Sequence, residues 1–366
     1  MKSKYYYIIF IFLLILTSIT LDILYTKIIT FCVITSLVVF YLVCATIIPF
    51  FIRYSRSVQK QIVFLNKIPF PINIDLKKPE TLGINGARNF YLHTNENVKV
   101  GVWQLLPQLY LNENKIIDDD YFDNVLSNTS IPIIVYLHGI FSNRALDHRI
   151  GLYKLLQKMN YHVITFDYRC FGDSDCADLS EIGVVEDSQY VLQWIMEKVK
   201  NNSTPIFVWG HSLGSGISLH TLAQLTAKNI HISGLFLESP FTNIADVYRG
   251  TIFYKLFSFL PWFYWSVIEP VDKQNLKFQS DKYIGVIKCP IIVIHAEDDE
   301  IVPFKLGEKL YNTGLQLHGM STNNLQMISI KSTFNCGHKN IYKYEKLPEI
   351  IENFITKCSP AVKLDK

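Results

Sequence analysis

The sequence lacks the features that usually mark nucleic-acid-binding and metal-binding proteins. Its formal net charge is +3 and it has no arginine-rich run, so we expect no nucleic-acid partner. The seven cysteines form no C-x-x-C pair and no metal-ligand spacing. We therefore expect no metal and no other cofactor, and the cysteines leave the redox compartment open. No internal repeat or low-complexity tract is present, and nothing in the chain indicates an oligomeric state.

Charged side chains are also missing from most of the first 52 residues. Residues 5–21 carry none, and after Asp22 and Lys27 neither do residues 28–52. A helix that spans a bilayer needs about 20 apolar residues, so the second run is long enough and the first is at the lower limit. Residues 1–52 are therefore predicted to be a membrane anchor with one span or two.

The side of the membrane depends on the number of spans. If both runs cross, the positive-inside rule places both ends of the chain in the cytosol. If only one crosses, with Lys2, Lys4 and Lys27 held inside, the rest of the chain is luminal. Residues 53–88 are predicted to connect the anchor to the next domain, and the basic, amphipathic part at 53–68 is expected to lie at the membrane surface.

The remainder, residues 89–358, is predicted to be one α/β domain. It begins with a hairpin formed by residues 89–93 and 98–103, and a polar segment at 112–130 is predicted to be a solvated loop. Short apolar strands then alternate with helix-patterned segments, which indicates a mostly parallel central sheet covered on both faces. The predicted strands are 131–137, 162–167, 205–209, 234–237, 289–295 and 326–330, and the predicted helices lie near 144–160, 181–200, 213–229, 303–318 and 345–357.

One motif points to nucleophilic catalysis. Gly210-His211-Ser212-Leu213-Gly214 follows the predicted strand at 205–209 and precedes a predicted helix. In a nucleophile elbow, a G-x-S-x-G sequence places the serine in a strained turn between strand and helix, with its hydroxyl above the edge of the sheet. The sequence therefore predicts that Ser212 is a nucleophile, and the alternative is a glycine-rich packing turn.

A serine needs a base, and the base needs an acid that orients it. In folds with a nucleophile elbow, the three residues occur along the chain in the order serine, acid, histidine. The acidic loop after the strand at 289–295 supplies Asp299, with Asp298 and Glu238 as alternatives. The loop after the last strand supplies His338 as the base.

Charge that develops on the substrate oxygen needs preorganised hydrogen-bond donors. The residue after the nucleophile provides one, so we expect the backbone amide of Leu213 to donate. The loop after the first parallel strand should provide the other, from the amide of Ile140. Arg144, Arg149 and Arg169 are interpreted as surface residues, and the alternative is contact with a substrate phosphate.

The alternation of strands and helices lapses between Glu238 and Cys289. We predict a cap at about 241–285, inserted after the sixth strand and lying over the serine. Its aromatic residues suit an acyl-chain pocket or a surface that dips into the bilayer interface, or they form the cap's own core. These residues are Phe253, Tyr254, Phe257, Phe259, Trp262, Phe263, Tyr264 and Trp265.

With these residues in place, the chain resembles the membrane-anchored α/β-hydrolase family of lysophosphatidylserine lipases and monoacylglycerol lipases. The resemblance runs from about residue 89 to 354. Its motifs are NFYL at 89–92, YLHG at 136–139, DHR at 147–149, YHVITFDYR at 161–169, WGHSLG at 209–214, LESPFTNI at 237–244, HAEDD at 295–299 and HKNIY at 338–342. One departure is Cys170, which stands where the family usually has glycine.

The resemblance implies an α/β-hydrolase fold with the triad Ser212, Asp299 and His338 and the amide pair of Ile140 and Leu213. It also implies an anchor in the endoplasmic-reticulum membrane and a luminal catalytic domain. We therefore expect a serine hydrolase that cleaves acyl esters of single-chain lipids taken from the bilayer, through an acyl-enzyme. The alternatives are an acyl-protein thioesterase, which a cytosolic orientation favours, and an inactive scaffold with a hydrolase fold.

Overall fold

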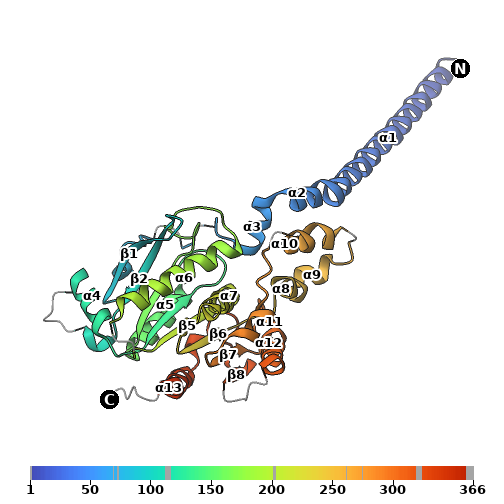
Figure 1. The fold of residues 1–366 in the computed structure, drawn as a ribbon. Coiled ribbons are helices and arrows are strands. Elements are labelled where there is room, and N and C mark those ends of the chain that lie inside the picture. Colours follow the sequence, from blue (N-terminus) through green and yellow to red (C-terminus); the bar gives the residue numbers. More distant parts are fainter. Residues whose placement is uncertain are drawn as a thin grey trace.

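The structure of the protein is a computed structural model, which describes residues 2–359 apart from 69, 72–73, 112–116, 201–202, 261, 274 and 319–323. An eight-stranded sheet in the order β1-β2-β4-β3-β5-β6-β7-β8 lies at its centre (Figure 1). The strands are β1 (Ala87–His93), β2 (Lys99–Leu105), β3 (Ile133–Leu137), β4 (His162–Phe166), β5 (Ile206–His211), β6 (Gly234–Glu238), β7 (Ile291–Ala296) and β8 (Leu325–Ile330).

The pairing of these strands confirms the predicted mostly parallel sheet. β3 to β8 run parallel to their neighbours, whereas β1 pairs antiparallel with β2 and β2 antiparallel with β4. The six parallel strands begin and end within two residues of the bounds expected from the sequence. Both faces of this sheet are covered, so its parallel strands are apolar along their whole length. This is why short continuous apolar runs predicted the strands correctly.

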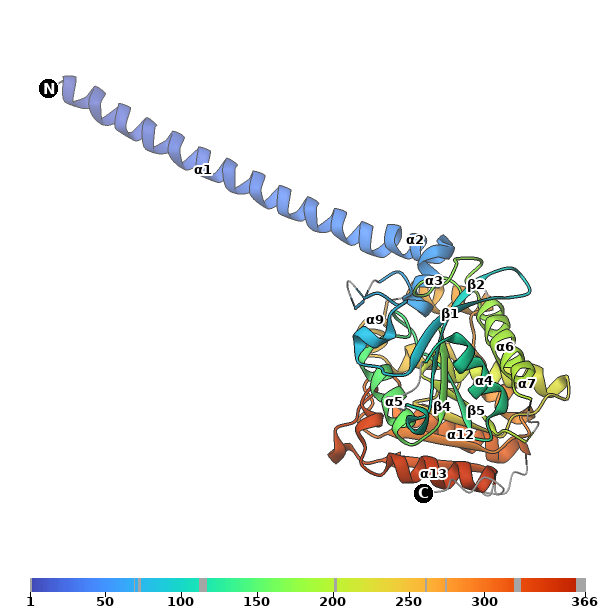
Figure 2. The same cartoon turned by 90° about the vertical axis from the view of Figure 1, so that its left-hand side faces the viewer.

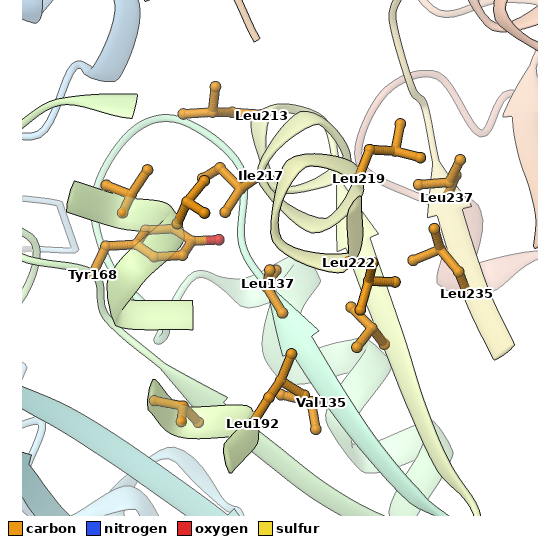
Figure 3. Close-up of a cluster of buried hydrophobic side chains, with 14 of the residues drawn as sticks. Val135, Leu137, Tyr168, Leu192, Leu213, Ile217, Leu219, Leu222, Leu235 and Leu237 are labelled. Atoms are coloured by element: carbon orange, nitrogen blue, oxygen red, sulfur yellow. The ribbon is translucent and has the colours of Figure 1, made fainter. Parts of the chain in front are cut away.

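Two apolar layers cover the sheet, and the alternation of side chains along each strand divides its residues between them. In β3, Val135 and Leu137 pack on one side and Ile134 and Tyr136 on the other. The helices that follow the strands supply the rest of each layer: α6 (Glu181–Lys198), α7 (Leu213–Ala227) and α12 (Phe304–His318) on the first side, and α5 (Asp147–Lys158) and α13 (Leu347–Cys358) on the second. Figure 3 shows Leu137 of β3 below Ile217 of α7, and Val135 of the same strand beside Leu192 of α6.

The polar segment before β3 is not a loop throughout, so that prediction was wrong for its second half. Residues Asp119–Asn128 form α4. The carboxylate of Asp118 caps the helix by accepting a hydrogen bond from the backbone N–H of Tyr121, at 2.9 Å. Phe122 and Leu126, four positions apart, are buried. The three consecutive aspartates therefore mark a helix N-terminus, where negative charge is favourable. Residues 112–116 lie outside the described residues.

The insertion after β6 is present and is mainly helical. It contains α8 (Ile244–Gly250), α9 (Ile252–Phe257), a π-helical turn (Tyr264–Ile268), α10 (Glu269–Lys273) and α11 (Ser280–Tyr283). A small cluster of its own, which includes Phe263, Val267 and Ile268, packs apart from the two main layers. Pro261 lies outside the described residues.

The amino-terminal region is a long helix that projects away from the rest of the protein (Figures 1 and 2). α1 (Lys2–Leu42), a π-helical turn (Val43–Ile47) and α2 (Ile48–Tyr54) follow one another without a break. Residues Tyr6–Tyr54 form a single helix that is long and apolar enough to cross a membrane. Both apolar runs of the sequence lie on this helix. α3 (Arg56–Phe64) then leads to the domain.

Candidate active site

Ser212 lies between β5 and α7 in a strained backbone conformation. Its φ of 54° and ψ of −120° are unusual for a residue with a side chain. A Cβ added to Gly214 would lie 2.0 Å from the carbonyl oxygen of Leu137, so only glycine fits there. The N–H of Ser212 donates to the carbonyl of Glu238, at 2.9 Å, which ties the turn to β6. This is the geometry of a nucleophile elbow.

His338 and Asp299 lie together at the carboxyl end of the sheet, although 39 positions separate them in the sequence. Nδ1 of His338 donates to Oδ2 of Asp299, at 2.7 Å. The other oxygen of Asp299 accepts from the backbone N–H groups of Ile301 and Val302, at 2.9 and 2.8 Å. Burial alone would raise the pKa of Asp299, but the hydrogen bonds to His295 and His338 hold it well below its usual range. Asp299 is therefore a fixed carboxylate that orients the imidazole.

The two alternative acids have other partners. Oδ2 of Asp298 accepts from the backbone N–H of Gly337, at 3.0 Å. Oε2 of Glu238 accepts from Nε1 of Trp209, at 2.7 Å, and burial raises the pKa of Glu238 to about 7. Neither carboxylate contacts the ring of His338 among the described residues, so the structure joins this ring to Asp299.

Ser212 and His338 line one cavity of about 220 Å³, whose surface is mainly apolar. In the part of the chain that the structure describes, no direct hydrogen bond joins their side chains. Such bonds are often long in a free hydrolase and shorten when substrate binds. His211 holds the backbone of the base by donating from Nε2 to the carbonyl of His338, at 3.0 Å. Burial and the neighbouring His338 keep the pKa of His211 well below its usual range, so this ring stays neutral.

The loop after β3 passes close to the nucleophile. A Cβ on Gly139 would lie 3.0 Å from Cβ of Ser212 and 3.2 Å from the carbonyl oxygen of His211, so glycine allows this approach. Ile140 follows and lines the cavity. Among the described residues, the backbone N–H groups of Ile140 and Leu213 donate to no protein acceptor. Both amides are therefore free to bind an oxyanion.

A buried arginine holds this loop in place. Nη2 of Arg149, in α5, donates to the carbonyls of Gly139, Ile140 and Phe141, at 3.2, 3.0 and 3.1 Å. Nη1 donates to the carbonyl of Asn143. Arg149 is only 1% exposed, and no described carboxylate forms an ion pair with it. The guanidinium therefore fixes four carbonyls of the loop that carries the amide of Ile140.

The interpretation of the three arginines as surface residues was wrong, because all three are buried. Arg144 pairs with Asp167 and Asp173, and Arg169 pairs with Asp187. The burial of Arg144 and Arg169 could not be predicted, because their carboxylate partners lie 18 to 29 positions further along the chain. For Arg149, the only signal was its place ten residues after Gly139, at the start of the helix that follows the loop.

The connector contributes one of its described residues to the lining of the cavity. Leu65, which follows α3, lines the cavity, together with residues that include Phe141, Leu146 and Ile301. No described residue of 241–285 does so, so the expectation that the insertion lies over the serine is not met at this cavity. The insertion packs against the anchor and connector instead. There, the hydroxyl of Tyr248 donates to the carbonyl of Ile62, at 2.8 Å.

A disulfide joins Cys170 and Cys176 in the loop after β4. Cys170 has a φ of 65°, in the left-handed region that favours glycine. No pattern in the sequence predicts this bond. Among the described residues, no group of three histidine, cysteine or acidic side chains is arranged to hold a metal ion.

The fold and the site define a serine hydrolase of the α/β-hydrolase class. The family model of the α/β-hydrolase fold matches residues 132–261. Among solved structures, the Pyrococcus furiosus esterase Pf2001 is 20% identical, with a TM-score of 0.56, over 80% of this chain and 96% of that one. Est1E from Butyrivibrio proteoclasticus is 14% identical, with a TM-score of 0.51, over 74% and 98%. Both likenesses confirm the predicted fold.

Curated relatives are much more similar. Lysophosphatidylserine lipase ABHD12 of Xenopus tropicalis is 39% identical over 308 residues, which cover 84% of this chain and 79% of the relative. The protein of the same name in Danio rerio is 37% identical over 313 residues, 86% and 81% of the two chains. Protein ABHD12B of Homo sapiens is 34% identical over 250 residues, 68% of each chain. The chain belongs to the ABHD12 family, which confirms the resemblance seen in the sequence.

Proposed function

We propose that this protein is a membrane-anchored lipase that cleaves the acyl ester of lysophospholipids, such as lysophosphatidylserine, and of monoacylglycerols. The observation that carries the proposal is the shared cavity: Ser212 on its elbow and His338, whose ring is bonded to Asp299, line one small, mainly apolar space. Relatives that are 37–39% identical are named lysophosphatidylserine lipases. An apolar space beside a serine nucleophile suits the carbonyl end of an acyl chain.

The proposed reaction proceeds in two halves. Oγ of Ser212 attacks the ester carbonyl and gives its proton to Nε2 of His338, while Asp299 holds the imidazolium that forms. The amides of Ile140 and Leu213 stabilise the tetrahedral oxyanion. As the intermediate collapses, His338 protonates the glycerol oxygen and the deacylated alcohol leaves. Water then gives a proton to His338 as it attacks the carbonyl of the acyl-enzyme. When this second intermediate collapses, His338 returns the proton to Oγ of Ser212 and the fatty acid leaves.

We propose that residues 28–52 cross the membrane once. The apolar helix of 49 residues is about 70 Å long, more than twice the ~30 Å thickness of a hydrocarbon core. Lys27 and Arg53 flank the second run at a spacing that suits one crossing. The positive charges of Lys2, Lys4 and Lys27 then place the amino terminus in the cytosol.

In this orientation the catalytic domain is luminal in the endoplasmic reticulum. The Cys170–Cys176 disulfide supports the proposal, because such bonds persist in oxidising compartments and are rare in the cytosol. Protease protection in sealed microsomes tests it. The domain is expected to be digested only after detergent is added, and digestion without detergent would place it in the cytosol.

The catalytic proposal is tested by fluorophosphonate labelling and a substrate panel. Wild type should be labelled and Ser212→Ala should not, and an unlabelled wild type would indicate an inactive scaffold. Lysophospholipids, monoacylglycerols and acyl-thioester peptides are then compared on purified membranes. Turnover of the two lipid classes supports the lipase, whereas turnover of thioesters alone would show an acyl-protein thioesterase.

A further inference from the structure

The insertion after β6 carries an exposed apolar edge, formed by Ile252, Leu256, Phe257, Phe259 and Tyr264. Leu256 is 56% exposed and Phe259 is 77% exposed. Single exposed apolar residues are common on protein surfaces, but a cluster in one short segment marks an interaction site. Residues 251–265 contain no acidic side chain, and Lys255 is their one charged residue. Without acidic side chains, the segment has no negative charge to attract a basic protein partner. Apolar side chains beside a single lysine suit a lipid surface instead.

The insertion edge is joined to the last turns of the apolar amino-terminal helix. Nη1 of Arg53, in α2, pairs with Oε2 of Glu269, at 2.7 Å. The same guanidinium lies 4.3 Å from the ring centre of Trp265, and the ring of Phe50 lies 5.3 Å from that of Trp265. The insertion therefore packs on α2, the part of the amino-terminal helix that is nearest to the domain.

The arrangement in space places this edge on the membrane side of the domain. In Figure 1, α10 lies next to α2 at the base of the long helix and α9 lies just below α10, whereas the sheet lies further from α2. Contacts between α2 and the turn Tyr264–Ile268 agree with that view. Where the helix leaves a bilayer, its neighbours are at the level of the lipid head groups.

We propose that the insertion edge is a second membrane contact, which enters the interfacial layer of the same leaflet from which α2 emerges. The proposal rests on the membrane anchoring proposed above. Aromatic side chains favour the head-group level, and lysine extends its charge outward from the apolar layer, as Phe259, Tyr264 and Lys255 would do here. Two contacts, the helix and the edge, fix the tilt of the domain on the bilayer, which the helix alone would leave free. The occupant of this surface is therefore the lipid bilayer itself.

Charged substitutions in the full chain, reconstituted in phosphatidylcholine–phosphatidylserine vesicles, test the contact. Leu256→Asp and Phe259→Asp should lower hydrolysis of a long-chain lysophospholipid in the vesicles by about tenfold, because a carboxylate on the edge opposes its insertion. Leu317→Asp is the matched control. Leu317, in α12, is 59% exposed, close to the value for Leu256, and lies outside the insertion. Hydrolysis of a water-soluble short-chain ester should be equal in all variants. Equal vesicle activity in Leu256→Asp and Leu317→Asp would overturn the proposal.

Fluorescence quenching tests the membrane contact even if the protein hydrolyses neither substrate. In the Trp265→Phe variant, lipids brominated near the head group should quench the fluorescence of Trp262, and Leu256→Asp should reduce that quenching. Trp103 and Trp209 are buried in the domain, and Trp194, in α6, packs partly buried against its core. These three tryptophans provide the background, which a Trp262→Phe/Trp265→Phe variant measures. Absence of quenching would refute the membrane contact, whereas quenching without any hydrolysis would refute the proposed function alone.

Discussion

Asp299 accepts a hydrogen bond from Nδ1 of His338, at 2.7 Å, while its neighbour Asp298 accepts from the backbone N–H of Gly337. The two carboxylates thus differ in what they hold, although both lie in one acidic loop. Asp299→Asn is expected to lower kcat by about 10⁴, because the amide favours the wrong tautomer of the imidazole. Asp298→Asn retains an oxygen that accepts from Gly337, so it should keep nearly all activity. Steady-state kinetics of both variants test the assignment, and similar losses in the two would contradict it.

The hydrogen bonds from Arg149 to the loop at 139–143 predict a specific kinetic defect. Arg149→Lys keeps the charge but loses the planar fork that reaches four carbonyls. With the amide of Ile140 less well positioned, kcat should fall about 10²-fold, as on removal of an oxyanion donor, with little change in KM. Thermal unfolding measured in parallel separates this from loss of fold. Wild-type kcat in a folded Arg149→Lys protein would show that the loop needs no clamp.

Glu238 makes stability depend on pH. Burial raises its pKa from an ordinary value near 4.5 to about 7, so the folded state holds its proton more tightly than the unfolded chain. Its contribution is complete below about pH 4.5 and is lost as the pH rises to about 7, a change of about 3 kcal/mol. Glu238→Gln should therefore gain stability relative to wild type between pH 5 and pH 8. Thermal unfolding at both pH values measures this, and a difference that does not vary with pH would be inconsistent with a raised pKa.

The disulfide and the backbone at Cys170 can be tested together. Cys176→Ser removes the Cys170–Cys176 bond and should cost about 2 kcal/mol of unfolding free energy. The double variant Cys170→Gly/Cys176→Ser also lacks the bond, but glycine adopts the φ of 65° without strain. It should recover up to about 1 kcal/mol of the loss. Denaturant unfolding compares the three proteins. A double variant less stable than Cys176→Ser would show that the positive φ is not costly.

The parts of the structure that the sequence predicted correctly depend on local signals. The alternation of apolar strands with helix patterns is a property of neighbouring residues, and the elbow at Ser212 needs its glycines within two positions. The order of Ser212, Asp299 and His338 along the chain follows from the topology of the sheet, which gathers the ends of β5, β7 and β8 at one edge. These features can be inferred without knowledge of how the segments pack.

Three features of the structure left no clear signal in the pattern of side chains along the sequence. Arg149 acts through carbonyl groups, which carry no trace in the side-chain pattern. Leu65 resembles any apolar residue of an amphipathic helix until α3 is placed against the cavity. In α4, Phe122 and Leu126 are the only deeply buried side chains, so the apolar stripe was too short to distinguish from a polar loop.

The position of Leu65 gives the amino-terminal helix a second role. A single extended residue, Ser55, separates α2 from α3, and Leu65, which follows α3, lines the space beside Ser212. In the anchored protein proposed above, a change in the tilt of the helix relative to the domain would move one residue that lines the cavity. Bilayers of different thickness, which change the tilt of a spanning helix, are therefore expected to change the rate of turnover.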